Sequence, residues 1–203
     1  MPTYAAPQDK VRDRVLDAAC ELFAARGINT TGVDLIAEVA GVSKRSLYQR
    51  FASKDDLIAA YLPVATDRFL NDLIPPADAG LSPVESILRV FTASQRASLD
   101  PGFGGCPVLN ASAEIRDATH PLRSAAVAYK DRLQEWFAAH AEAAGATDPV
   151  LLAEQLAILF DGAMSYTSVR ARPIPDSVYV TARALLTAQG LPLPAEQPAP
   201  AAS

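Results

Sequence analysis

The chain has 203 residues, of which 50% are apolar and 20% are charged, and its formal net charge is −5. This composition is enough for a packed core and for one large or two small domains, and it excludes a chain that is disordered throughout. The acidic total also excludes a general polyanion binder covered in lysine, although a local basic patch still acts over about 8–10 Å.

The first residues, MPTYAAPQDKVRDR, lack the apolar core of a secretion signal, and no apolar run reaches about 18 residues. We therefore expect a cytoplasmic protein that does not enter a membrane. The two cysteines, Cys20 and Cys106, cannot form a disulfide framework, and His120 and His140 add no credible metal-ligand spacing. Neither a metal nor a cofactor is expected.

Apolar residues recur at helical intervals and strand signals are nearly absent, which predicts an all-α protein of about nine helices. Gly27 should end the first helix, Thr31 and Ser43 can cap the second and third, and Pro63 should bend the fourth. The first four helices are expected at residues 9–26, 33–40, 44–50 and 54–73.

The later helices have similar signals. The sequence SPVE, Ser82 to Glu85, has the spacing of a capping box with proline at the first helical position. The glycines of GFGG, residues 102–105, are expected to form a flexible connection, because no Lys-Ser/Thr follows them as in a phosphate loop. The expected helices span residues 82–99, 108–116, 121–144, 149–170 and 176–189.

The basic residues are distributed unevenly. Residues 1–62 carry eight Lys or Arg and eight Asp or Glu, whereas residues 63–203 carry ten against fifteen. Within the stretch AGVSKRSLYQRFASKDDL, four basic residues lie between Ser43 and Lys54 with no acid among them. Two short helices joined by a glycine-containing turn and supported by a preceding helix indicate a helix-turn-helix, whose second helix can enter the DNA major groove.

Residues 8–62 resemble the DNA-binding domain of the TetR family of transcriptional regulators, most specifically in IAEVAGVSKRSLYQRF. The resemblance implies phosphate contacts from Thr31, Tyr48 and Lys54. The N-terminus of the second helix, capped by Ser43, also favours a phosphate because its backbone amides are free.

Base contacts are expected from the start of the same helix. The resemblance points to Lys44, Arg45 and Gln49, and arginine or lysine to guanine is the commonest direct contact. Arg45 stands where the family often has a small residue or proline, which suggests an additional contact. The predicted DNA-binding set is Thr31, Ser43, Lys44, Arg45, Ser46, Tyr48, Gln49 and Lys54.

The helix expected at 149–170 indicates self-association. Between Leu151 and Val169 only Glu154 and Asp161 are charged and apolar residues face every direction, so the helix must be buried on more than one side. With the last helix it predicts a two-fold dimer through a four-helix interface, which the TetR resemblance also implies. The predicted interface residues are Leu152, Leu156, Leu159, Ala163, Val178, Ala182 and Leu185.

The segment GCPVLNASAEIRDATHPLR, residues 105–123, resembles the ligand-domain signature of one subset of TetR regulators. This resemblance implies a small-molecule effector. Cys106 precedes a predicted helix N-terminus, which favours a thiolate, so it is either a sensor of electrophiles or oxidants or a small packed residue. The predicted effector pocket comprises Phe69, Phe91, Phe103, Cys106, Asn110, Tyr129, Trp136 and Tyr166, although aromatics at helical spacing are more often core.

The sequence therefore predicts a homodimeric regulator, a repressor released from a palindromic DNA operator by a small molecule. Residues 1–62 should bind double-stranded DNA, residues 63–190 the effector and a second copy, and residues 191–203 should be a disordered tail. The alternatives are a redox sensor acting through Cys106, an enzyme using Asp117 and His120, and a helix-turn-helix that contacts a protein.

Overall fold

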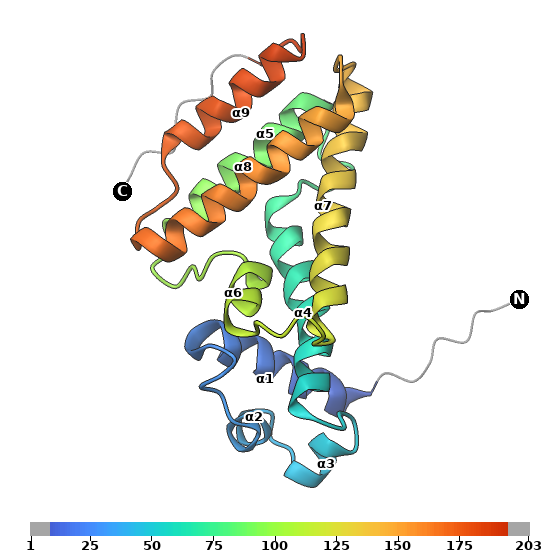
Figure 1. Cartoon of the computed structure of the whole chain (residues 1–203), viewed down its shortest axis with the longest axis vertical. Helices are drawn as coiled ribbons and strands as arrows, with labels where there is room; N and C mark the ends of the chain where they lie inside the picture. Colours follow the sequence, from blue (N-terminus) through green and yellow to red (C-terminus); the bar gives the residue numbers. More distant parts are fainter. Residues whose placement is uncertain (1–8, 195–203) are drawn as a thin grey trace, which may run out of the picture.

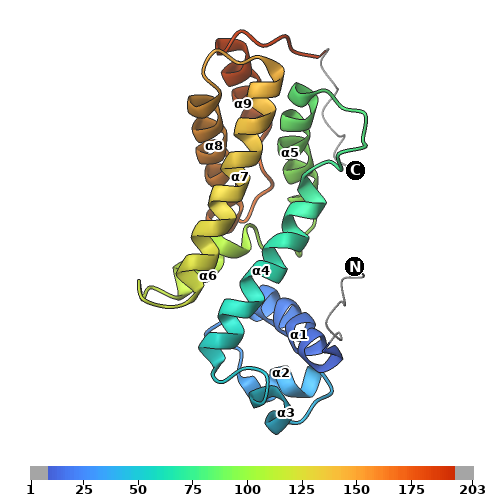
Figure 2. The same cartoon turned by 90° about the vertical axis from the view of Figure 1, so that its right-hand side faces the viewer.

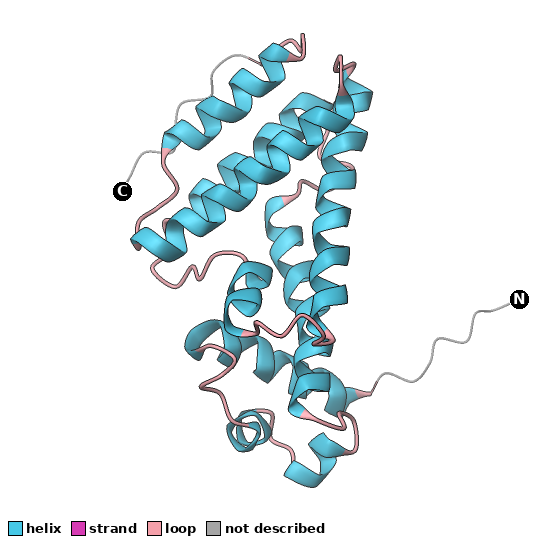
Figure 3. Ribbon diagram, viewed as in Figure 1, coloured by secondary structure: helices cyan, strands magenta, loops and turns pink. Residues whose placement is uncertain are grey.

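The structure is a computed structural model that describes residues 9–194, and within them the chain forms nine α-helices and no strand (Figures 1 and 3). The predicted all-α class is confirmed. Most of the predicted tail, residues 195–203, lies outside the described residues. No helix in the described range is long and apolar enough to cross a bilayer.

The N-terminal helices begin where short polar side chains cap them. The carboxylate of Asp9 accepts hydrogen bonds from the amides of Val11 and Arg12, and the hydroxyl of Ser53 accepts one from Asp56. The third helix is two residues shorter than predicted, because it ends at Tyr48. The four helices are α1 (Lys10–Arg26), α2 (Val33–Val39), α3 (Lys44–Tyr48) and α4 (Lys54–Leu73).

The helices α1 to α4 share one apolar core. Ile36 of α2, Leu47 of α3 and Leu57 of α4 are fully buried, so they fix α2 and α3 against α1 and α4. Val39, the last residue of α2, is 47% exposed. Gly41 adopts a φ of +63° in the turn between α2 and α3, a conformation that favours glycine.

Among the five later helices, α5 begins at the predicted cap. Ser82 and Glu85 form the full capping box at the start of α5, and Asp148 caps α8 through the amide of Leu151. Gly145 takes the left-handed conformation after α7. The helices are α5 (Pro83–Ala97), α6 (Pro107–Glu114), α7 (Leu122–Ala144), α8 (Pro149–Arg170) and α9 (Asp176–Ala188).

The long helix α4 connects the two ends of the molecule. Figure 2 shows it leaving the group formed by α1, α2 and α3 and running up beside α7 toward α5, and it contacts α1, α5, α6 and α7. It is continuous through residues 62 and 63, where we predicted a domain boundary. Figure 1 shows α8 and α9 side by side at the opposite end from α3.

Candidate nucleic-acid interface

The outward side of α3 exposes long polar side chains. Leu47 is fully buried and anchors the helix, while Lys44, Arg45 and Gln49 are exposed and Tyr48 is 43% exposed. Figure 1 places α3 at the end of the molecule farthest from α9. A short helix held by one buried leucine therefore presents a cation pair, an amide and a phenol to whatever approaches that end.

The two serines at the start of α3 hydrogen-bond to each other. The Ser43 hydroxyl accepts from the amide of Ser46 at 3.0 Å and donates to the Ser46 hydroxyl oxygen at 2.9 Å. Ser43 thus caps α3 as predicted. Both residues shape the start of the helix, because their hydroxyls already have partners.

Ion pairs engage two of the basic residues near α3. The ammonium of Lys44 lies 2.7 Å from the Asp34 carboxylate, and this hydrogen bond raises the pKa of Lys44. The guanidinium of Arg50 lies 3.1 Å from Asp9. Within residues 9–194, Arg45 has no ion-pair partner, so its charge is free to meet an external anion or base.

Two of the residues expected to touch phosphates have structural partners. Thr31 is fully buried, and its hydroxyl donates to the carbonyl of Gly27 at 2.7 Å. It does not cap α2 as predicted, because Gly32 is the N-cap residue and no side chain bonds there. The ammonium of Lys54 donates to the carbonyl of Ile28 at 2.7 Å, so this lysine holds the turn between α1 and α2.

The same turn is held by a residue that the sequence did not assign to a role. One oxygen of Glu114, the last residue of α6, accepts from the amide of Ile28 at 3.0 Å, and the other accepts from Asn29 at 2.8 Å. The side-chain amide of Asn29 donates a hydrogen bond to the backbone carbonyl of Glu114 at 3.3 Å. A Cβ at Gly27 would stand 3.1 Å from the carboxylate, so glycine leaves the room that Glu114 uses. The signal in the sequence was that Glu114 lies in the segment 105–123, which resembles part of a TetR ligand domain.

A second contact joins α4 to the start of α7. His120 is buried; its Nδ1 accepts from the amide of Leu122 at 3.0 Å, and its Nε2 lies 3.5 Å from the Asp55 carboxylate. Asp117 instead accepts from the amide and hydroxyl of Thr119. The side chains of Asp117 and His120, which we considered as an acid/base pair, therefore do not hydrogen-bond to each other, and His120 contacts both α4 and α7.

The cysteine considered as a sensor is inside the core. Cys106 is fully buried, and its thiol lies 3.9 Å from the hydroxyl of Tyr129. Burial raises the pKa of Tyr129, so its hydroxyl stays neutral. A thiol without exposed surface cannot meet an electrophile unless the core opens, which favours the packing role.

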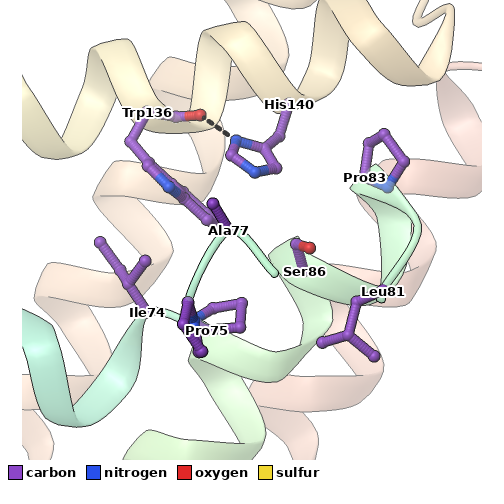
Figure 4. A pocket seen from close by; sticks show the side chains of 9 residues that line it. Ile74, Pro75, Ala77, Leu81, Pro83, Ser86, Trp136 and His140 are labelled. Carbon is purple, nitrogen blue, oxygen red and sulfur yellow. Dashed lines mark hydrogen bonds between the residues drawn. The ribbon is translucent and has the colours of Figure 1, made fainter. Parts of the chain in front are cut away.

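The residues predicted to line an effector pocket have different surroundings in the structure. Phe91, Cys106 and Tyr129 are core residues, and Asn110 is exposed and bonds to the carbonyl of Gly104. The ring of Phe69 packs against those of Phe103 and Phe160, with centroid distances of 6.3 and 6.4 Å. The ring of Tyr166 lies beneath the Arg170 guanidinium. Of the predicted set, Trp136 lines a cavity of about 400 Å³ next to the α4–α5 loop (Figure 4).

The predicted interface on α8 and α9 consists largely of residues that pack inside the chain. Four of its residues, Leu152, Leu156, Ala163 and Ala182, are buried in the core of the chain itself, so they have no surface left for a partner. Leu159, Val178 and Leu185 are partly buried. The large apolar residues that are exposed on these two helices are Val150, Leu151, Ile158, Val169 and Val180, at 68%, 42%, 66%, 80% and 61%.

Solved structures with the same fold align along nearly the whole chain. A TetR-type transcriptional regulator from Streptomyces avermitilis is 40% identical, with a TM-score of 0.81 over 89% of this chain and 98% of that one. A TetR-family regulator from Streptomyces coelicolor is 30% identical, with a TM-score of 0.76 over 90% and 97%.

Residues 15–61 match the family described as "Bacterial regulatory proteins, tetR family". Two curated relatives from Mycolicibacterium smegmatis match over shorter segments. The HTH-type transcriptional activator FasR is 45% identical over 32% of this chain and 30% of its own length, and the repressor KstR2 is 35% identical over 42% of each. The chain thus matches less than half the length of these two relatives.

Proposed function

Because the chain belongs to the TetR family of transcriptional regulators, we propose that it is a homodimeric cytoplasmic repressor that a small molecule releases from a palindromic DNA operator. The observation that carries this proposal is the exposed Lys44–Arg45 pair on α3, with the free charge of Arg45 next to Tyr48 and Gln49. An arginine at the start of such a helix can donate two hydrogen bonds to a guanine, and Tyr48 can donate to a phosphate.

Dimerisation supplies the second half of the operator contact. On α8 the outward residues Leu151, Ile158, Gly162, Ser165 and Val169 follow each other at spacings of seven, four, three and four, which gives one stripe along the helix. A Cβ at Gly162 would meet no other atom, so a partner backbone can approach closely there. This stripe supports a two-fold interface through α8, in which α9 takes part through Val180.

The two-fold axis gives the regulator its specificity. One short helix discriminates few base pairs, whereas two related copies read a palindrome whose half-sites are about 34–36 Å apart. Any change in the separation of the two α3 helices therefore changes affinity for the operator.

Two contacts support a route from the effector to α3. The helix α4 begins at Lys54, which holds the carbonyl of Ile28, and it ends beside the α4–α5 loop about 30 Å away. Glu114 holds the same turn from α6. A ligand that moves α4 or α6 therefore acts on the turn that positions α2 and α3. A coupling of about 1–3 kcal/mol would weaken DNA binding about 5- to 150-fold.

The first test is fluorescence anisotropy of the protein on the intergenic DNA beside its own gene and on a scrambled duplex, at about 150 mM salt. The proposal expects specific binding about a thousandfold or more tighter than binding to the scrambled duplex. Equal weak affinity for both, together with no enriched motif in a selection from random DNA, would contradict it.

A further inference from the structure

A cavity of about 400 Å³ lies between the end of α4, the α4–α5 loop, the start of α5 and α7 (Figure 4). Its volume is within the usual range of small-molecule sites, about 300–1,000 Å³. It is lined by Ile74, Pro75, Pro76, Ala77, Leu81, Pro83, Ser86, Trp136 and His140.

The side chains that line this cavity, which we call the Trp136 cavity, are mostly apolar, whereas polar atoms form nearly half of its exposed lining. Six of the nine lining residues are aliphatic or proline, and none is Asp, Glu, Lys or Arg. Pro75 and Pro76 fix their own φ angles, so the loop that forms one wall has few conformations to lose when a ligand binds. The absence of a charged lining residue favours an uncharged ligand, because a buried ion would have no counter-charge.

One polar atom in this wall has a defined hydrogen-bonding role. The Nδ1 of His140 lies 2.9 Å from the carbonyl oxygen of Trp136, and a carbonyl only accepts, so Nδ1 carries the proton. In the neutral ring Nε2 is then an acceptor. Figure 4 shows the side of the ring opposite this bond turned toward the space among Ala77, Ser86 and Pro83.

The acceptor is also held in place. The rings of His140 and Trp136 lie with centroids 3.8 Å apart and an interplanar angle of 30°, so stacking and the Nδ1 bond together fix the imidazole. A pre-oriented acceptor of this kind discriminates between ligands that do and do not bring a donor, because only the former gain a hydrogen bond.

We propose that the Trp136 cavity binds an uncharged, mostly apolar molecule with one hydroxyl group, of the class of substituted phenols, as the effector of the regulator. The ring lies between the prolines and Trp136, and the hydroxyl donates to Nε2 of His140. This inference rests on the proposed function for its effector role. Ile74 of the lining is the C-cap of α4, so a ligand here touches the end of the helix whose first residue holds the α1–α2 turn.

The probe pair is 4-cyclohexylphenol and its methyl ether, which differ in the hydroxyl proton. Trp136 is the only tryptophan of the chain, so its fluorescence reports on this cavity directly. We expect the phenol to shift the Trp136 emission and to bind about three- to tenfold tighter than the ether in calorimetry, which is the usual contribution of one net hydrogen bond.

The variant His140→Phe keeps a ring beside Trp136 but removes the acceptor. It should reduce phenol affinity to that of the ether and leave ether affinity unchanged. Ala77→Phe, in the exposed loop, should fill the cavity and abolish binding of both probes even if His140→Phe is unstable. Gln134→Ala, on the exposed side of α7, is the control and should bind the phenol like the natural chain.

Equal affinity for phenol and ether, or phenol binding that survives both variants, would overturn the site. Operator anisotropy with and without the phenol then separates the two proposals. Loss of operator binding on adding phenol supports both, whereas phenol binding with unchanged operator affinity overturns the effector role alone. If the protein binds phenol but shows no specific DNA binding, the result supports the binding site but contradicts the proposed function, and with it the effector role.

Discussion

The carboxylate of Glu114 connects α6 to the turn that precedes α2, and its removal has a calculable cost. Ile28 is 2% exposed, so in Glu114→Ala its amide loses its partner with little access to water. An unsatisfied buried donor costs about 1–3 kcal/mol. The backbone amide of Asn29 is exposed and can donate to water instead, so the loss of its bond adds little to the cost. We therefore expect a loss of about 2 kcal/mol of unfolding free energy.

Glu114→Gln retains one acceptor oxygen for the Ile28 amide, so it should cost less than about 1 kcal/mol. Urea denaturation measures both values, and Glu142→Ala, an exposed position on α7, is the control that should stay within about 0.5 kcal/mol. Hydrogen exchange locates the effect, because the Ile28 amide should exchange about ten- to thirtyfold faster in Glu114→Ala. A Glu114→Ala protein with natural stability and natural exchange at Ile28 would refute this reasoning.

Three further predictions concern DNA and assembly. Arg45→Ala should cost about 1–3 kcal/mol on the operator and relax one base position, measured by anisotropy on single-base variants; a uniform loss on all sequences would contradict base reading. Asp34→Asn frees Lys44, so it should raise affinity for all duplexes and steepen the salt dependence by about one phosphate contact, whereas an unchanged slope would exclude Lys44 from the contact. Ile158→Asp should give monomers in sedimentation velocity. The control Val127→Asp, at a position on α7 that is 58% exposed, should leave the dimer intact. If both variants remain dimeric, the interface lies elsewhere.

The helices could be predicted because their ends are set by local chemistry. Ser53, Ser82 and Asp148 each supply an oxygen to an amide three residues later, and the predicted bounds of α4 and α8 agree with the structure. Such signals depend on residues a few positions apart, so a single sequence contains them. The exposure of the cations on α3 could be predicted in the same way, because Leu47 fixes which side of the helix is buried.

Contacts between distant segments were missed for the converse reason. Lys54 was expected to bind phosphate, yet its ammonium also reaches the carbonyl of Ile28, and nothing in the neighbouring sequence marks that acceptor. Glu114 bonds to amides 85 and 86 residues away. The aromatic residues of the predicted pocket were chosen by type, whereas burial of Phe91 and Tyr129 in the core depends on how α5 and α7 pack.

The burial of the predicted interface residues of α8 has a simple physical origin that also bears on function. A helix with apolar residues on every side has no polar face to mark the direction of the solvent, so its sequence indicates double burial without saying which side faces its own core. Packing against α7 and α9 buries Leu152 and Leu156 and leaves Ile158 and Val169 outside. These outward residues stay apolar although they face water in one copy, and a large exposed apolar surface of this kind is characteristic of an interface. A second copy that covers them would fix the spacing of the two α3 helices, on which reading a palindrome depends.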